Sequence, residues 1–98
     1  MIIIAGHLEL EPADRDALAA DSATAVALAR GTEGCLDFSV SADPLDPTRA
    51  NVLERWETAE ALLAFRGDGP ADGVVDRVLA FNIEEYEVTV AHLPSYLD

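Results

Sequence analysis

The stretch Cys35-Leu36-Asp37-Phe38-Ser39-Val40-Ser41-Ala42 decides the fold of this 98-residue chain. Apolar and polar side chains alternate along it, which is the pattern of a β-strand with one buried face. We expect the even-numbered residues to face one way, and Cys35 with the other odd-numbered residues to face the other. Residues 43–47 are rich in proline and aspartate and end the strand in a turn. Residues 51–57 form a returning strand, so the centre of the chain predicts a β-hairpin.

A strand and a helix are predicted on the N-terminal side of this hairpin. Residues 2–10 are rich in β-branched side chains and indicate a strand. Pro12 is suited to the first turn of a helix, which runs through an alanine-rich stretch to about Arg30. Gly31 can then end the helix in a left-handed conformation.

The C-terminal side repeats the order of helix and strand. Thr58 can cap a short helix over 59–66, and Pro70 can open a second helical piece that ends near Leu79. A last strand follows over 81–90, and 91–98 form an irregular tail. The complete order, β-α-β-β-α-β, predicts an α+β fold of the ferredoxin-like, split-βαβ type with a four-stranded antiparallel sheet.

The length indicates a single domain over residues 1–98. Two helices can cover only one face of a four-stranded sheet, and the other face carries enough apolar side chains to need cover as well. Pairing with the same face of a second copy is the simplest solution. We therefore expect a homodimer.

The charge of the chain limits its partners. Nineteen acidic residues outweigh six arginines, and the formal net charge is −13. The arginines are scattered without a basic stripe, which disfavours binding to nucleic acid. A lone cysteine rules out an internal disulfide and favours a reducing compartment. The apolar start over 1–5 is too short for a signal or membrane segment, so we expect a cytoplasmic protein without a membrane contact.

Motifs for metals, nucleotides and nucleophiles are missing from the sequence. The two histidines and the cysteine lie far apart without metal-ligand spacing, and no glycine-rich loop joins a strand to a helix. No GxSxG motif is present, and Cys35 has no nearby histidine to act as its base. We expect no metal and no cofactor, and we interpret Cys35 as a small packing residue.

Two residues stand out as candidates for chemistry. His7 lies in the middle of the first strand, where it can be a hydrogen-bonded structural residue or a general base that titrates near neutrality. Trp56, the only tryptophan, ends the third strand, where it can be a core residue or the flat wall of an aromatic-binding pocket. The first and third strands are central neighbours in this topology. We therefore expect His7 and Trp56 to meet in one cavity.

Two passages resemble a known family. Gly31-Thr32-Glu33-Gly34-Cys35-Leu36-Asp37-Phe38 is similar to its passage from the first helix into the second strand, and Leu53-Glu54-Arg55-Trp56-Glu57-Thr58-Ala59-Glu60-Ala61-Leu62 resembles its corner from the third strand into the second helix. The family is the antibiotic biosynthesis monooxygenase (ABM) domain of the dimeric α/β-barrel superfamily. The resemblance covers nearly the whole chain.

This resemblance implies homodimers with a pocket in each subunit between sheet and helices. Some members oxygenate quinols or anthrones with O2 and without a metal or organic cofactor. Here it implies a small aromatic substrate, with His7 as base or hydrogen-bond partner and Trp56 against the ring. Three aromatic residues are interpreted first as core residues: Phe38, Phe65 and Tyr86. Together with Arg66, they are also candidate substrate-binding residues.

Departures from the family pattern leave a second interpretation open. Many relatives have a histidine where this chain has Phe65 followed by Arg66, which disfavours haem oxygenation. Some oxygenating members place an asparagine four residues before the tryptophan, where this chain has Val52. The neighbouring Asn51 is expected on the opposite side of the sheet. The alternative to a monooxygenase is a non-catalytic homodimer of the same fold that binds a small ligand or serves as an interaction module.

Overall fold

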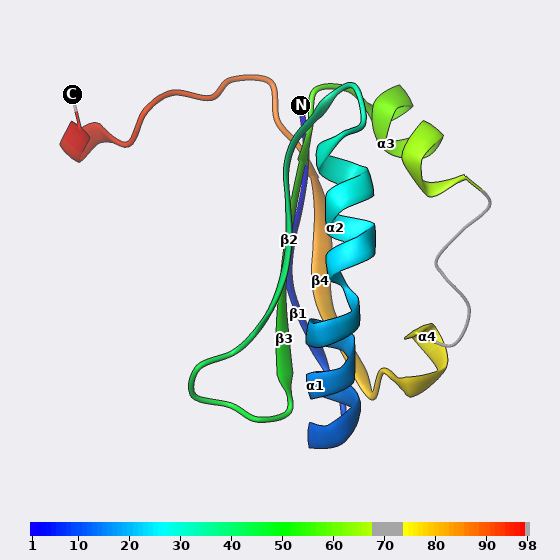
Figure 1. Cartoon of the computed structure of the whole chain (residues 1–98). Coiled ribbons are helices and arrows are strands. Elements are labelled where there is room, and N and C mark those ends of the chain that lie inside the picture. The colour runs from blue at the N-terminus through cyan, green and yellow to red at the C-terminus, as the bar shows by residue number, and fades with distance from the viewer. Residues whose placement is uncertain (68–73, 98) are drawn as a thin grey trace.

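The computed structural model of the chain describes residues 1–67 and 74–97. A single sheet carries the α-helices of the described residues on one side (Figure 1). The elements run in the order β1 (Ile2–Glu9), α1 (Pro12–Asp21), α2 (Ala23–Arg30), β2 (Cys35–Ala42), β3 (Arg49–Trp56), α3 (Ala59–Arg66), α4 (Val74–Arg77), β4 (Ala80–Glu87) and the 3-10 turn η1 (Ser95–Leu97).

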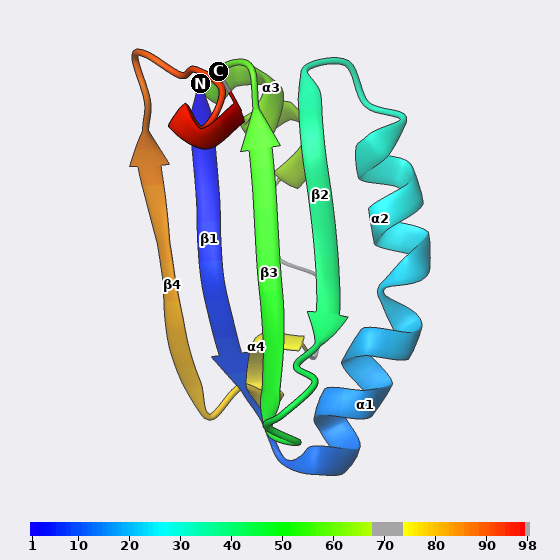
Figure 2. The ribbon, with the colours of Figure 1, turned by 90° about the vertical axis from the view of Figure 1, so that its left-hand side faces the viewer.

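The four strands form one antiparallel sheet in the order β2-β3-β1-β4 (Figure 2). The predicted α+β, ferredoxin-like arrangement is therefore confirmed, and β1 and β3 are the central pair. Ile2 of β1 pairs with Trp56 of β3, and the register continues without a shift to Glu9 and Arg49. Because side chains alternate along a strand, this register assigns every residue of the central pair to a face.

The core lies between the sheet and the helices. Ile2, Ile4, Phe38 and Trp56 from the strands pack with Ala29 of α2 and Leu62 of α3. The small side chain of Ala29 lets α2 approach the sheet closely. None of the helices in the described residues has the length and apolarity that a bilayer span requires.

The other face, which we call the open face, holds the alternate residues of each strand. Their charges are nearly balanced, in contrast to the acidic chain as a whole, because two arginines accompany three acids. The members of the open face are Ile3, Ala5, His7 and Glu9 of β1, Asp37, Ser39 and Ser41 of β2, Arg49, Asn51, Leu53 and Arg55 of β3, and Ala80, Asn82, Glu84 and Tyr86 of β4.

The first helix differs from the prediction, because the expected helix over 12–30 is divided at Ser22. The hydroxyl of Ser22 donates a hydrogen bond to the carbonyl of Ala19, at 2.9 Å. A serine that bonds back to the preceding turn competes with regular helical bonding and bends the helix. In the last helical region, α4 begins at Val74, and Pro70 lies outside the described residues.

The start of β2 also differs from the prediction. Cys35 pairs with Trp56 and Asp37 pairs with Arg55, so Leu36 is an extra residue on this strand. This β-bulge reverses the alternation at the strand start. Cys35 consequently lies on the same face as Phe38, and the expectation that the two face opposite ways is wrong.

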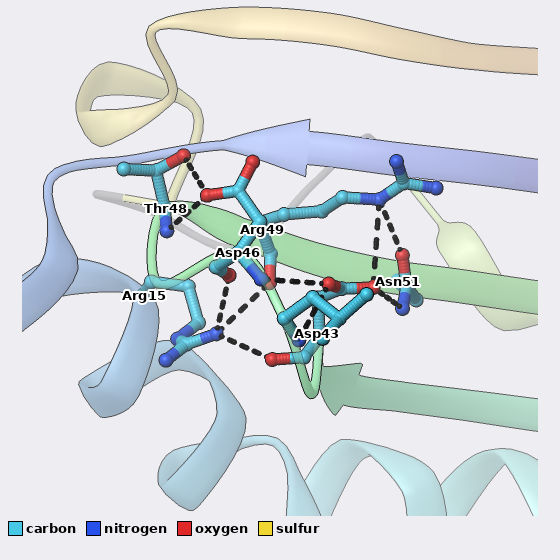
Figure 3. Close-up of polar contacts among 7 residues, drawn as sticks. Arg15, Asp43, Asp46, Thr48, Arg49 and Asn51 are labelled. Atoms are coloured by element: carbon cyan, nitrogen blue, oxygen red, sulfur yellow. Dashed lines mark hydrogen bonds and ion pairs between the residues drawn. The ribbon is translucent and has the colours of Figure 1, made fainter.

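A buried arginine holds the loop between β2 and β3. Nη1 of Arg15 in α1 donates to the carbonyls of Asp43, Asp46 and Arg49, at 3.3, 3.1 and 3.2 Å (Figure 3). The carboxylate of Asp43 accepts from Nδ2 of Asn51 and from the backbone N–H groups of Asp46 and Leu45. These hydrogen bonds, that from Asn51 first, lower the pKa of Asp43 to about 2.

Candidate functional site

A buried carboxylate and the only tryptophan lie side by side at the end of β3. Glu54 and Trp56 are two residues apart, so both point to the face that carries the helices. Trp56 is completely buried and Glu54 is 6% exposed. The indole Nε1 of Trp56 donates to Oε1 of Glu54 at 3.1 Å.

The second partner of this carboxylate comes from α3. Nη2 of Arg66 lies 3.3 Å from Oε1 and 3.1 Å from Oε2 of Glu54. The Arg66 side chain remains 41% exposed, so the pair connects a buried anion to the surface. A buried carboxylate is costly unless it is paired and hydrogen-bonded, and here it is both.

Two phenylalanines complete the arrangement. The ring of Phe65 lies 5.3 Å from that of Trp56 and 5.6 Å from that of Phe38, centroid to centroid, with the second contact edge-on. Phe65 is half-buried, whereas the other two rings are buried. We call Phe38, Glu54, Trp56, Phe65 and Arg66 the Trp56 cluster.

Two local features place α3 over the Trp56 cluster. Thr58 caps the helix as predicted, because its Oγ1 accepts from the N–H of Ala61 at 3.1 Å. Gly34, with φ of 88°, lies directly under Ala61: a Cβ at Gly34 would stand 2.6 Å from the Ala61 Cβ. The glycine thus lets α3 sit close to the start of β2, which brings Phe65 and Arg66 to the sheet.

Cys35 lies beside the Trp56 cluster but is poorly suited to nucleophilic chemistry. Burial raises the pKa of its thiol, and the nearby charges of Asp37 and Glu54 raise it further. The thiol contacts the carbonyl of Asp37 at 3.6 Å. A protonated thiol is a weak nucleophile, in agreement with the interpretation of Cys35 as a packing residue.

His7 lies on the other side of the sheet. It pairs with Asn51 of β3 and Asn82 of β4, and all three belong to the open face. Trp56 pairs with Ile2, five positions from His7 along an unshifted strand, so the two side chains point in opposite directions. The expectation that His7 and Trp56 meet in one cavity is therefore wrong.

The remaining candidate site residues are also divided between the two faces of the sheet. Phe38, Phe65 and Arg66 come together with Trp56, as described above. Tyr86 pairs with Ile3 and is exposed on the open face. Asn51 also lies on the open face, opposite to Val52, as expected from the alternation.

Glu54 was not among the residues singled out from the sequence. A glutamate within a strand normally indicates a solvent-exposed position, and its partner Arg66 is twelve residues away on another element. The available signal was the spacing of Glu54 and Trp56, because residues at i and i+2 of a strand share a face. A carboxylate two residues before a core tryptophan on a central strand points to the helix-covered face, and once buried there it needs a cationic partner.

Other groupings in the described residues are less suited to chemistry. Within 1–67 and 74–97, no three histidine, cysteine or acidic side chains gather closely enough to hold a metal ion. A hollow of about 40 Å³ lies apart from the Trp56 cluster, between α1 and α4. Its lining residues are Leu10, Asp14, Ala17, Leu18, Asp21 and Arg77.

Comparison with known proteins gives a family match and several similar folds. The family model described as antibiotic biosynthesis monooxygenase matches residues 1–72. No curated protein matches the chain.

Among solved structures, a candidate antibiotic biosynthesis monooxygenase from Deinococcus radiodurans is 23% identical, with a TM-score of 0.73 over 94% of this chain and 96% of that one. A similarly described protein from Nitrosomonas europaea is 16% identical, with a TM-score of 0.76 over 92% and 100%. A third, from Chloroflexus aurantiacus, is 24% identical, with a TM-score of 0.62 over 93% and 95%.

Proposed function

The chain belongs to the antibiotic biosynthesis monooxygenase family, and from this premise we propose that it is a homodimeric monooxygenase that uses O2 to oxidise a small quinol- or anthrone-like aromatic, without a bound cofactor. The observation that carries the proposal is the buried Glu54 carboxylate, which joins the Trp56 indole to the Arg66 guanidinium. Aromatic surface next to a hydrogen-bond acceptor and a cation is what a phenolic substrate requires.

Each member of the Trp56 cluster has a distinct role in this proposal. The half-buried ring of Phe65 contacts the substrate, while the enclosed rings of Trp56 and Phe38 support it from behind. Glu54 accepts a hydrogen bond from the substrate hydroxyl and takes its proton, which makes it the general base of the proposal. The partly exposed guanidinium of Arg66 stabilises the negative charge that develops on the substrate oxygen.

The chemistry requires no external reductant. Removal of a proton from an anthrone-type substrate gives an electron-rich anion, which can pass an electron to O2 directly. The CH2 group becomes a carbonyl with one oxygen atom of O2, and the other oxygen atom leaves as water. The substrate supplies all four electrons. The contribution of the protein is to position the ring, to exclude water and to stabilise the anion.

We assign the dimer interface to the open face. Its nearly balanced charge, Glu9, Asp37 and Glu84 against Arg49 and Arg55, would let two copies of an acidic chain approach each other. Ile3, Leu53 and Tyr86 supply apolar surface, and His7 lies between two asparagines at its centre. His7 is thus a dimer contact in this proposal. The lone cysteine favours a reducing, cytoplasmic location.

The experiment is an oxygen-electrode assay with a panel of quinols and anthrones, without NADH, flavin or metal and against a no-enzyme control for autoxidation. We expect O2 consumption above the control. Glu54→Gln should lower turnover about a hundredfold, the lower end of the usual effect of a proton-transfer group. The exposed Glu60 of α3 provides the matched control Glu60→Gln, which should retain wild-type turnover. No turnover across the panel, or equal turnover in both variants, would contradict the proposal.

One observation favours the alternative of a non-catalytic ligand-binding dimer. Trp56 is completely enclosed and Glu54 is already neutralised by Arg66, which is an arrangement that also suits a purely structural core. Under this alternative, aromatic ligands would raise the melting temperature without any O2 consumption above the autoxidation control. The same ligand panel therefore separates the two functions.

A further inference from the structure

The segment that follows β4 leaves the body of the subunit. Its last connection to the sheet is at Val88, whose N–H donates to the carbonyl of Met1 at 2.8 Å and whose carbonyl accepts from the Met1 ammonium at 3.0 Å. We call residues 89–97 the arm. In the described part of the chain, the hydrogen bonds of the arm are internal, including that from Leu97 N–H to the Pro94 carbonyl at 2.9 Å.

The arm projects on the side of the sheet away from the helices. Figure 1 shows it extending from the end of the sheet on the open-face side, and Figure 2 shows its terminal turn in front of that face. Tyr96 is 84% exposed, and the other large apolar side chains of the arm are exposed as well. These side chains are Val90, Leu93 and Leu97.

The composition of the arm differs sharply from that of the chain. A quarter of all residues are charged, yet residues 88–97 contain no aspartate, glutamate or arginine. Single exposed apolar residues are ordinary on protein surfaces, but four within nine residues form an apolar segment of the kind that marks an interaction site. An uncharged arm can also approach a second copy of a chain whose net charge is −13 without repulsion between like charges.

We propose that the arm of each subunit docks on the second copy of this chain in the homodimer, with Tyr96 and Leu97 as its anchors. This inference rests on the dimer of the proposed function. If two open faces pack face to face, the sheets lie about 10 Å apart, and the second copy occupies the space beside the arm. By two-fold symmetry each subunit then both gives and receives an arm.

The arm is built for such a contact. Pro94 and the 3-10 turn at Ser95–Leu97 limit its conformations, so little entropy is lost when it binds. Tyrosine is among the residues that most often dominate binding energy at interfaces, because it buries a large rigid ring and keeps a polar end. The Met1–Val88 hydrogen bonds fix the root of the arm to its own subunit.

The test is the dissociation constant of the dimer, measured by sedimentation equilibrium on the full-length chain. The triple variant Leu93→Ser, Tyr96→Ser, Leu97→Ser should raise this constant at least about tenfold, the effect of losing one interface anchor. Leu28→Ser is the matched control, because Leu28 is 64% exposed on α2, on the side of the sheet away from the open face and the arm (Figure 1). The control should leave the dissociation constant unchanged.

The outcomes separate this inference from the proposed dimer. A monomeric wild type would overturn both, whereas an unchanged dissociation constant in the triple variant would overturn only the docking of the arm. A tighter dimer in the triple variant would also overturn it, because the arm would then cover the open face of its own subunit. Hydrogen exchange of the wild type gives a second measurement that needs no variant. Residues 90–97 should become protected only above the dissociation constant, and equal protection below it would contradict the proposal.

Discussion

His7 and Trp56 lie on opposite faces of the sheet, although they belong to neighbouring strands. Trp56 pairs with Ile2, and His7 pairs with Asn51. The helix-covered face therefore contains the Trp56 cluster, and the open face contains the histidine. A base that acts beside Trp56 must come from the helix-covered face, where Glu54 is the buried acidic residue among those that the structure describes.

Replacement of His7 by alanine follows directly from this relationship. His7→Ala should change O2 turnover less than about twofold at protein concentrations far above the dimer dissociation constant, because His7 lies on the face away from the Trp56 cluster. Loss of a general base, by contrast, would lower turnover about a hundredfold or more. The same variant should weaken the dimer measured by sedimentation. A hundredfold loss of turnover in a fully dimeric sample would instead identify His7 as the base.

Removal of the Glu54 side chain should destabilise the fold. Glu54→Ala leaves the buried Trp56 N–H without its acceptor, and we expect a loss of about 1–3 kcal/mol in the free energy of unfolding. Glu54→Gln keeps an acceptor oxygen and should lose less. Urea denaturation monitored by tryptophan fluorescence measures both. Equal losses of unfolding free energy in the two variants would show that Glu54 stabilises the fold mainly through its charge pair with Arg66, rather than through its hydrogen bond to Trp56.

The cap of α3 is a local test of stability. Thr58→Ala removes the acceptor for the Ala61 N–H and should cost about 1 kcal/mol. Thr58→Ser retains the hydroxyl and should restore most of the loss. Thermal unfolding followed by circular dichroism compares the two variants, and identical melting temperatures would mean that the cap contributes nothing.

Asp43 should make the protein sensitive to acid. Its pKa is lowered to about 2 from an ordinary value of 3.8, so its contribution to stability is complete above pH 4 and is lost as the pH falls towards 2. Asp43→Asn should flatten the dependence of the unfolding free energy on pH in that window. An unaltered acid-denaturation profile in Asp43→Asn would assign the sensitivity to other carboxylates, such as Asp46, whose pKa is also lowered.

Gly6 should tolerate no side chain. Its φ is 145°, and a Cβ would collide with the backbone of Asn82 and Ile83 in the neighbouring strand. Gly6→Ala should therefore cost about 2 kcal/mol or more, from overpacking and backbone strain together. Gly31→Ala is the control, because a Cβ there meets only ordinary contacts. Equal stability of the two variants in urea would refute this expectation.

The alternation over 35–42 and the turn residues after it were sufficient to predict the hairpin, and the β-α-β-β-α-β order followed from the flanking patterns. It was harder to predict which residues of β1 point to the helices. Ile2, Ile3 and Ile4 are consecutive apolar residues, so the sequence shows no alternation there that distinguishes the two faces. The burial of Glu54 depends on Arg66 arriving from a separate element. Such a pairing is a tertiary event that strand periodicity does not encode.

The three hydrogen bonds from Arg15 to the β2–β3 loop span 28, 31 and 34 residues of sequence. A connection between adjacent strands, usually among the most local parts of a fold, here depends on a contact with high sequence separation. The three carbonyls meet this donor only once α1 has docked beside the loop, so we expect these hydrogen bonds to form late in folding. Substitution of Arg15 should accelerate unfolding and leave the folding rate almost unchanged, because its bonds would be absent from the transition state.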